Sequence, residues 1–174
     1  MMKKALYIFL ALIALLVIAI FAVPEKYNFE KSILINAPAA KVYKNINSTK
    51  AFNQWNPWLK LDPNMKMEYS GTQGQIGDKY CWDSQNSDAG AGCQEIVELV
   101  PNQRQKTKMD FKRPFEDTSY SEVILTPEGN GTKVSWTLDS ELERPMNLMR
   151  FFMDGAMDKS YGEGLAKLKE ISEK

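Results

Sequence analysis

The sequence contains no histidine and only two cysteines, Cys81 and Cys93, among its 174 residues. Histidine is the commonest general base and a frequent metal ligand, so its absence excludes a Ser-His-Asp or Cys-His hydrolase. A structural zinc site needs four Cys or His ligands, and two cysteines alone do not supply them. We therefore expect no metal site, no cofactor and no recognisable catalytic residue.

The chain also lacks an excess of positive charge, with 22 Lys and Arg residues against 22 Asp and Glu residues. Lys3 and Lys4 precede a hydrophobic run, so the rest of the chain has 20 basic and 22 acidic residues, a net charge of −2. Nucleic-acid-binding proteins carry a basic excess or a basic stripe. We expect no nucleic-acid partner.

One long hydrophobic run is present, Ala5–Val23, which contains no charged residue and ends at Pro24. As a helix it would reach ~28 Å, close to the hydrocarbon thickness of a bilayer. The alternative is a cleaved signal peptide, whose apolar region usually spans about 7–15 residues before a small-x-small site. No good site of that kind precedes Pro24. The run predicts an uncleaved single-pass anchor in residues 1–24, followed by one domain in residues 25–174.

The orientation of this anchor follows from Lys3 and Lys4, which the positive-inside rule keeps on the cytoplasmic side. The domain would then be periplasmic or otherwise extracytoplasmic. Lys26 and Lys31, on the far side of the run, weaken this prediction.

The last segment, Pro145–Ile171, predicts a helix of about 27 residues, or ~40 Å. Its apolar residues recur close to helical spacing and predict one buried face, made of Met149, Phe152, Met153, Ala156, Met157, Leu165, Leu168 and Ile171. Such a face is either ordinary core or an adaptable wall for apolar ligands, for which methionine is well suited.

The middle of the chain alternates apolar and polar residues and predicts an antiparallel sheet. A strand in Tyr27–Ile35 is followed by two short helices, Ala39–Asn47 and Lys50–Trp55. Six further strands are predicted in Met65–Ser70, Lys79–Ser84, Ala91–Val100, Lys106–Lys112, Ser119–Thr126 and Thr132–Leu142. A sheet of this size twists, and the long helix would cover its open side. We expect an α+β fold with a cavity between sheet and helix.

Several segments, taken in this order, resemble a known superfamily. They are Ile33–Pro38 followed by Val42-Tyr43, Trp55–Trp58, Asp62-Pro63, Tyr69–Gly71, Gly77, Tyr80–Trp82, Gly90–Gly92, Phe111–Phe115, Gly131–Trp136 and Gly164–Leu168. The chain from Tyr27 onward resembles the START-related helix-grip (SRPBCC) superfamily, and within it the polyketide cyclase/dehydrase-like branch. The resemblance implies a curved antiparallel sheet wrapped around the C-terminal helix, over a pocket for lipids, polyketides or other apolar molecules. It implies no shared catalytic motif.

Nine aromatic and methionine side chains are candidates for lining this cavity: Trp55, Trp58, Trp82, Met109, Phe111, Phe115, Trp136, Met149 and Met153. Ordinary core packing is the alternative for all of them, and the better interpretation for Met109 and Trp136. Trp58 and Phe115 follow proline-containing loops, which favours the mouth of a pocket.

Cys81 and Cys93 lie equally far from Ser87, the centre of a predicted hairpin loop. In a symmetric hairpin they would face each other ~4.5–5.5 Å apart, within disulfide range. An oxidising compartment would favour the bond, and two unlinked thiols are the alternative. The two cysteines lack the C-x-x-C spacing of a redox-catalytic pair.

The internal carboxylates that remain for acid–base chemistry are Glu95, Glu98, Asp110 and Glu122, and strand alternation places Asp110 and Glu122 outward. Tyr69 or Tyr80 could polarise a carbonyl group. With no histidine, binding ranks above catalysis.

We therefore expect membrane-tethered binding of a hydrophobic small molecule or lipid, with membrane contact through residues 5–23. The alternatives are a cyclase- or dehydratase-type enzyme on the same fold and an interaction module whose cavity is filled by side chains. The sequence predicts no particular oligomeric state.

Overall fold

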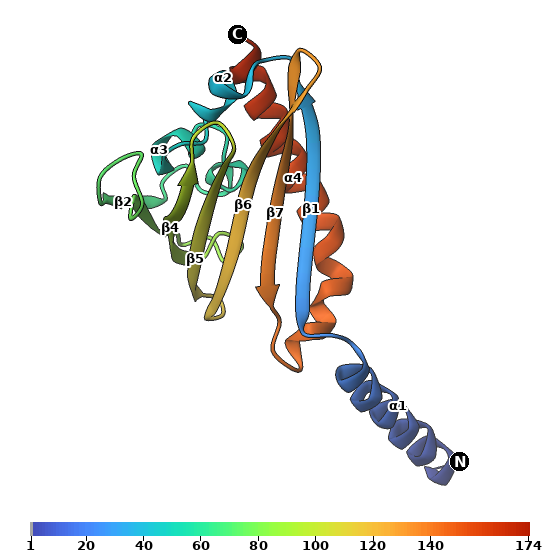
Figure 1. Ribbon diagram of the computed structural model, residues 1–174. Helices are drawn as coiled ribbons and strands as arrows, with labels where there is room; N and C mark the ends of the chain where they lie inside the picture. The colour runs from blue at the N-terminus through green and yellow to red at the C-terminus, as the bar shows by residue number, and fades with distance from the viewer. Residues whose placement is uncertain (1) are drawn as a thin grey trace.

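The structure is a computed structural model that describes residues 2–174 (Figure 1). Seven antiparallel strands form one sheet in the order β1-β7-β6-β5-β4-β3-β2. The strands are β1 (Lys26–Ile35), β2 (Lys66–Ser70), β3 (Lys79–Asp83), β4 (Ala91–Val100), β5 (Arg104–Arg113), β6 (Asp117–Glu128) and β7 (Gly131–Glu141). The helices are α1 (Met2–Ala22), α2 (Ala39–Tyr43), α3 (Thr49–Phe52), α4 (Arg150–Glu173) and the 3-10 helices η1 (Pro57–Leu61) and η2 (Met146–Met149).

The sheet is a meander closed at one edge by the pairing of its first and last strands, from Lys26 opposite Glu141 to Ile35 opposite Thr132. The strands alternate as the sequence predicts, and on β7 the inward residues Val134, Trp136 and Leu138 are buried. The helix α4 packs across β1 and β7 (Figure 1). The predicted α+β helix-grip fold is therefore confirmed.

The core lies where the second half of α4 meets the sheet. Tyr161, Leu165 and Leu168 are each at most 2% exposed. The Tyr161 ring stacks on Trp136 with centroids 3.9 Å apart. Gly164 makes this contact possible, because a Cβ there would lie 2.8 Å from the Trp136 ring and 3.2 Å from Pro57.

The prediction of one continuous buried face along the last helix is wrong for its first half. Phe152 is 82% exposed, Met149 is 42% exposed and Ala156 is exposed, whereas Met153 and Met157 are partly buried against the core. Phe152 lies nine residues before Tyr161, which is two and a half turns. The two side chains therefore point to opposite sides of the helix.

The amino-terminal helix α1 is long and apolar enough over Lys3–Ala22 to cross a membrane, a test that a signal sequence would also pass. Its residues lie almost entirely outside the packed part of the chain (Figure 1). Val23, Pro24 and Glu25 connect it to β1.

Two glycines of α4 give a matched test of the close approach at Trp136. Gly164→Ala should lower the free energy of unfolding by about 1–3 kcal/mol, because the methyl group overpacks the interface. Gly155→Ala should raise it by about 0.5–1 kcal/mol, because Gly155 faces open space and alanine favours helix. Urea unfolding of the full chain in detergent measures both, and equal effects would contradict the assignment of Gly164.

Candidate functional site

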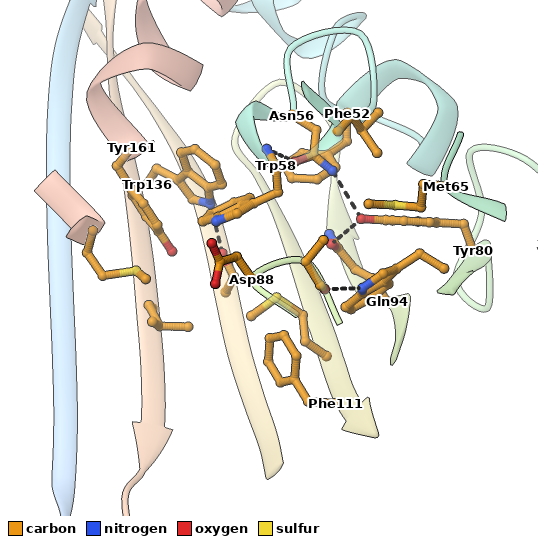
Figure 2. A pocket seen from close by; sticks show the side chains of 17 residues that line it. Phe52, Asn56, Trp58, Met65, Tyr80, Asp88, Gln94, Phe111, Trp136 and Tyr161 are labelled. Carbon is orange, nitrogen blue, oxygen red and sulfur yellow. Dashed lines mark hydrogen bonds between the residues drawn. The ribbon is translucent and has the colours of Figure 1, made fainter. Parts of the chain in front are cut away.

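A cavity of about 250 Å³ lies between the sheet, η1 and α4 (Figure 2). Most of its lining is aromatic or aliphatic, with a few polar groups. The lining residues are Phe52, Asn56, Trp58, Leu59, Met65, Tyr80, Trp82, Asp88, Ala89, Gln94, Met109, Phe111, Ser121, Trp136, Leu138, Met157 and Tyr161.

One wall is built around Trp136 from β7. Its indole Nε1 donates to Ser121 Oγ at 2.8 Å, and Ser121 Oγ donates to the Thr137 carbonyl at 2.7 Å. Trp58 packs edge-on against Trp136, with centroids 5.7 Å apart. The side chain of Asn56, which precedes η1, accepts from the Trp58 backbone amide and so sets where this helix begins.

The facing wall is formed by Trp82 and Phe111, whose ring centroids are 5.7 Å apart. The indole ring of Trp82 lies over Gly92, its partner on the neighbouring strand. A Cβ atom at position 92 would come within 2.7 Å of that ring. The indole Nε1 donates to the Ala89 carbonyl at 2.9 Å. A side chain at position 92 would displace Trp82, so the glycine determines the shape of this wall.

The polar corner of the cavity consists of Tyr80, Gln94 and Asn56 (Figure 2). Tyr80 donates to Gln94 Oε1 and accepts from Asn56 Nδ2, both at 3.2 Å. Burial raises the pKa of Tyr80 well above its ordinary value, and the nearby Tyr69 adds to this, so the phenol stays protonated. Among the described residues, Gln94 Nε2 has no hydrogen-bond acceptor. It can donate to a ligand oxygen.

A second, more open groove of about 1090 Å³ lies beside this cavity. Its lining comes from the β5–β6 turn, the end of β7, η2 and the start of α4. The residues are Phe111, Arg113, Pro114, Phe115, Glu116, Asp117, Thr118, Glu141, Leu142, Glu143, Met146, Met149 and Met153. Phe111 lines both spaces and therefore lies between them.

The nine candidate residues divide into three groups. Trp58, Trp82, Met109, Phe111 and Trp136 line the cavity. Phe115, Met149 and Met153 line the groove instead, together with Phe111.

Trp55 lines neither space. It is 2% exposed, packs edge-on against Trp136 and Phe52, and donates from Nε1 to the Asn45 carbonyl at 2.8 Å. The structure therefore makes Trp55 part of the core, because the chain after α3 turns this ring away from the cavity.

Sequence reasoning named Tyr80 as a candidate but missed the rest of the polar lining. Gln94 and Tyr80 are cross-strand partners, a relationship that depends on the register of β3 and β4. Asn56 was visible only as the residue before Pro57. Met157 belongs to the apolar face predicted for the last helix, and Tyr161 could have been added to that face because the two residues lie one turn apart.

The set of internal carboxylates also needs correction. Asp78, absent from the predicted set, is 3% exposed and accepts hydrogen bonds from the Thr49 hydroxyl and the Thr49 and Gly74 amides. These bonds give it a structural role. Asp88, also unpredicted, lines the cavity from an exposed loop.

Asp110 and Glu122 lie outside the cavity and pair with lysines on the outer face of the sheet, at 2.9 Å to Lys108 and 2.8 Å to Lys106. The hydrogen bond from Lys108 lowers the pKa of Asp110. Both carboxylates therefore belong to the solvent-facing surface of the sheet.

Cys81 and Cys93 lie directly opposite each other on β3 and β4, and the structure joins them in a disulfide. Successive side chains of a strand alternate between faces, so the cysteines lie on the face opposite Tyr80, Trp82 and Gln94. The pair connects the two strands behind the cavity wall without entering the cavity.

Reduction should weaken this part of the sheet. A cross-link that closes a loop of this length stabilises by about 3 kcal/mol in the chain-entropy model. We expect dithiothreitol to lower the urea midpoint of the full chain in detergent by a corresponding amount. The double substitution Cys81→Ser/Cys93→Ser should reproduce this loss and abolish the response to reductant. An unchanged midpoint in both cases would show that the bond contributes nothing.

Comparison with known proteins gives a family and a fold. The family model described as polyketide cyclase/dehydrase and lipid transport matches residues 26–173. The structure of CV1439 from Chromobacterium violaceum matches with a TM-score of 0.61 at 16% identity, covering 84% of this chain and 97% of that protein. TTHA0849 from Thermus thermophilus matches with a TM-score of 0.59 at 21% identity, covering 84% and 97%.

A third structure is the di-domain ARO/CYC StfQ from the steffimycin biosynthetic pathway, with a TM-score of 0.64 at 12% identity. The match covers 85% of this chain and 51% of StfQ, so this chain spans about half of that protein. The comparison with curated proteins found no significant match. At these identities the structural likeness shows the fold alone.

Proposed function

Because the chain belongs to the polyketide cyclase/dehydrase and lipid transport family, we propose that it binds an apolar small molecule in the cavity between the sheet and α4. A lipid or a polyketide-like compound fits the chemistry of the lining. We further propose that residues 1–24 tether the binding domain, residues 25–174, to a membrane.

The observation that carries the binding proposal is an unfilled, mainly aromatic cavity with one polar corner. Ligand sites are typically apolar spaces of about 300–1,000 Å³ with a few polar groups that orient the ligand. The cavity of about 250 Å³ lies just below this range and adjoins the larger groove. Gln94 Nε2 supplies the orienting donor, and an unfilled interior argues against a fully packed interaction module.

The tether proposal is supported by contacts between α1 and the folded domain. Asn147, which is fully buried, donates from Nδ2 to the carbonyls of Ile20 and Val23, both at 2.8 Å. Arg144 pairs with Glu25 at 2.9 Å. The last carbonyls of a helix need such partners. Cleavage near Val23 would remove the acceptors of a buried amide, which favours an uncleaved anchor.

An enzyme on the same fold is the second candidate, favoured by Tyr80. Its protonated hydroxyl and the Gln94 amide lie together in an otherwise apolar cavity, where hydrogen-bond donors polarise a carbonyl more strongly than in water. It ranks behind binding because Tyr80 already donates to Gln94. If turnover of a polyketone substrate were found and Tyr80→Phe abolished it without changing binding, the enzymatic function would take precedence.

Native mass spectrometry of the full chain, released from detergent after purification from its own host, tests binding. We expect one co-purifying apolar molecule per chain, identified by solvent extraction. Met109→Trp should lower its occupancy at least ~10-fold, because the indole fills the cavity. Met67→Trp is the matched control, since Met67 is 39% exposed on β2. Equal occupancy in both variants, or an empty wild type, would refute the binding site.

The membrane tether predicts where the cysteine pair lies. With an outward domain, Cys81 and Cys93 are oxidised in the cell and resist maleimide labelling of intact spheroplasts until a reductant is added. The chain should also remain in the pellet after alkaline carbonate extraction. Free labelling without a reductant, or release by carbonate, would contradict the outward orientation or the anchor respectively.

A further inference from the structure

The lining of the cavity carries charge of one sign only. Of the described residues that line it, Asp88 alone is charged, and none is a lysine or an arginine. Burial raises the pKa of Tyr80 and of Tyr161 well above the ordinary value, so both phenols stay neutral. A molecule that enters the cavity therefore meets one negative charge and no positive charge.

Asp88 lies at the rim of the cavity. It belongs to the loop between β3 and β4 and is exposed, and its carboxylate points into the cavity (Figure 2). Because Asp88 is exposed, its carboxylate keeps much of its hydration, as would a ligand group bound beside it. The charge therefore faces the ligand without the large desolvation penalty of a buried ion.

The loop that carries Asp88 is held in place by hydrogen bonds. Asn86 Oδ1 accepts from the Asp88 amide at 2.9 Å, and Asn86 Nδ2 donates to the Leu61 carbonyl of η1 at 3.0 Å. Ser84, at the start of the loop, donates from Oγ to the Asp62 carboxylate at 2.5 Å. These bonds tie the loop to the end of η1, so the position of Asp88 is set before a ligand arrives.

The carboxylate of Asp88 has no ion-pair partner among residues 2–174. Two cations of adjoining elements, Lys60 of η1 and Arg113 at the end of β5, pair with other carboxylates, those of Glu163 and Asp83. The charge of Asp88 is therefore available to a group of the ligand.

Aromatic rings share the cavity with this charge. Trp58, Trp82 and Phe111 all line it, and Trp82 Nε1 donates to the carbonyl of Ala89, the residue after Asp88. The face of a tryptophan ring attracts a cation. A carboxylate together with tryptophan rings suits an ammonium group, whereas a carboxylate or phosphate of the ligand would be repelled by Asp88.

We propose that the ligand carries a cationic nitrogen, which Asp88 holds at the rim while the apolar part of the molecule occupies the cavity. This inference rests on the proposed binding function and names the class of ligand that the same site selects. A protonated amine or a quaternary ammonium group meets the requirement. An anionic molecule without such a nitrogen, for example an ionised fatty acid, is disfavoured. Asp88 is thus a specificity-determining residue.

Isothermal titration calorimetry of the full chain in dodecyl maltoside tests the charge preference with three probes of one apolar skeleton. The probes are 4-phenylbutylamine, a cation at pH 7, 4-phenylbutan-1-ol, which is neutral, and 4-phenylbutanoate, an anion. The wild type should bind the amine about 5-fold more tightly than the alcohol, the gain expected of one exposed ion pair. It should bind the anion more weakly than the alcohol.

Substitutions at Asp88 identify the source of the preference. Asp88→Asn should weaken amine binding about 5-fold and leave alcohol binding unchanged. Asp88→Lys should reverse the order, so that the anion binds more tightly than the amine. Glu68→Lys is the matched control, because Glu68 is exposed on β2 opposite Cys81, on the face of the sheet away from the cavity. Unchanged alcohol binding shows that each variant is folded with an intact cavity.

The outcomes separate the charge preference from the proposed function. Equal affinity for the three probes, or amine binding that Asp88→Lys does not weaken, would overturn the preference and leave the binding function intact. An equal loss of amine binding in Glu68→Lys would trace the effect to general surface charge and would also overturn the role of Asp88. A wild type that binds none of the three probes would contradict the binding function itself.

Discussion

The stacking of Tyr161 on Trp136 is the contact on which the rest of the structure depends. The two rings lie 3.9 Å apart because Gly164 lets α4 approach the sheet closely. Trp136 is fixed in turn by its bond to Ser121 and by the edge-on rings of Trp58 and other neighbours. The second half of α4 is thereby clamped to β7. The cavity begins where this clamp ends, since α4 continues over the sheet but no longer packs tightly against it.

An unfilled space of this kind has an energetic cost that ordinary packing would avoid. Side chains that line a space with no partner atoms on one side lose the dispersion contacts they would otherwise make. An apolar ligand that occupies the space recovers part of this penalty by dispersion contacts. Hydrogen bonds from their indole Nε1 atoms hold Trp82 and Trp136 in place, which supports the binding function proposed above.

The fold could be predicted from the sequence because its elements are periodic. Alternation along the strands placed Met109, Phe111 and Trp136 on the inner face, as the structure confirms. The site was predicted less completely, because its polar corner depends on the register that sets Tyr80 opposite Gln94. Met149 lines the groove rather than the cavity, together with Phe115 and Met153. It lies in the 3-10 helix η2, before α4 begins.

The same uneven packing also relates α1 to the cavity. The second half of α4, which packs on Trp136, lies far from α1. The first half, residues 150–160, is weakly held because none of its residues is buried. It begins beside the residues that fix α1 to the domain, Arg144, Asn147 and Arg150. A displacement of α1 would therefore act on the weakly held half of α4 while leaving the contact between Tyr161 and Trp136 unchanged. The cavity wall and its cover thus differ in local stability. If the cavity binds an apolar molecule as proposed above, the packed half would keep the domain folded while the weakly held half admits the ligand.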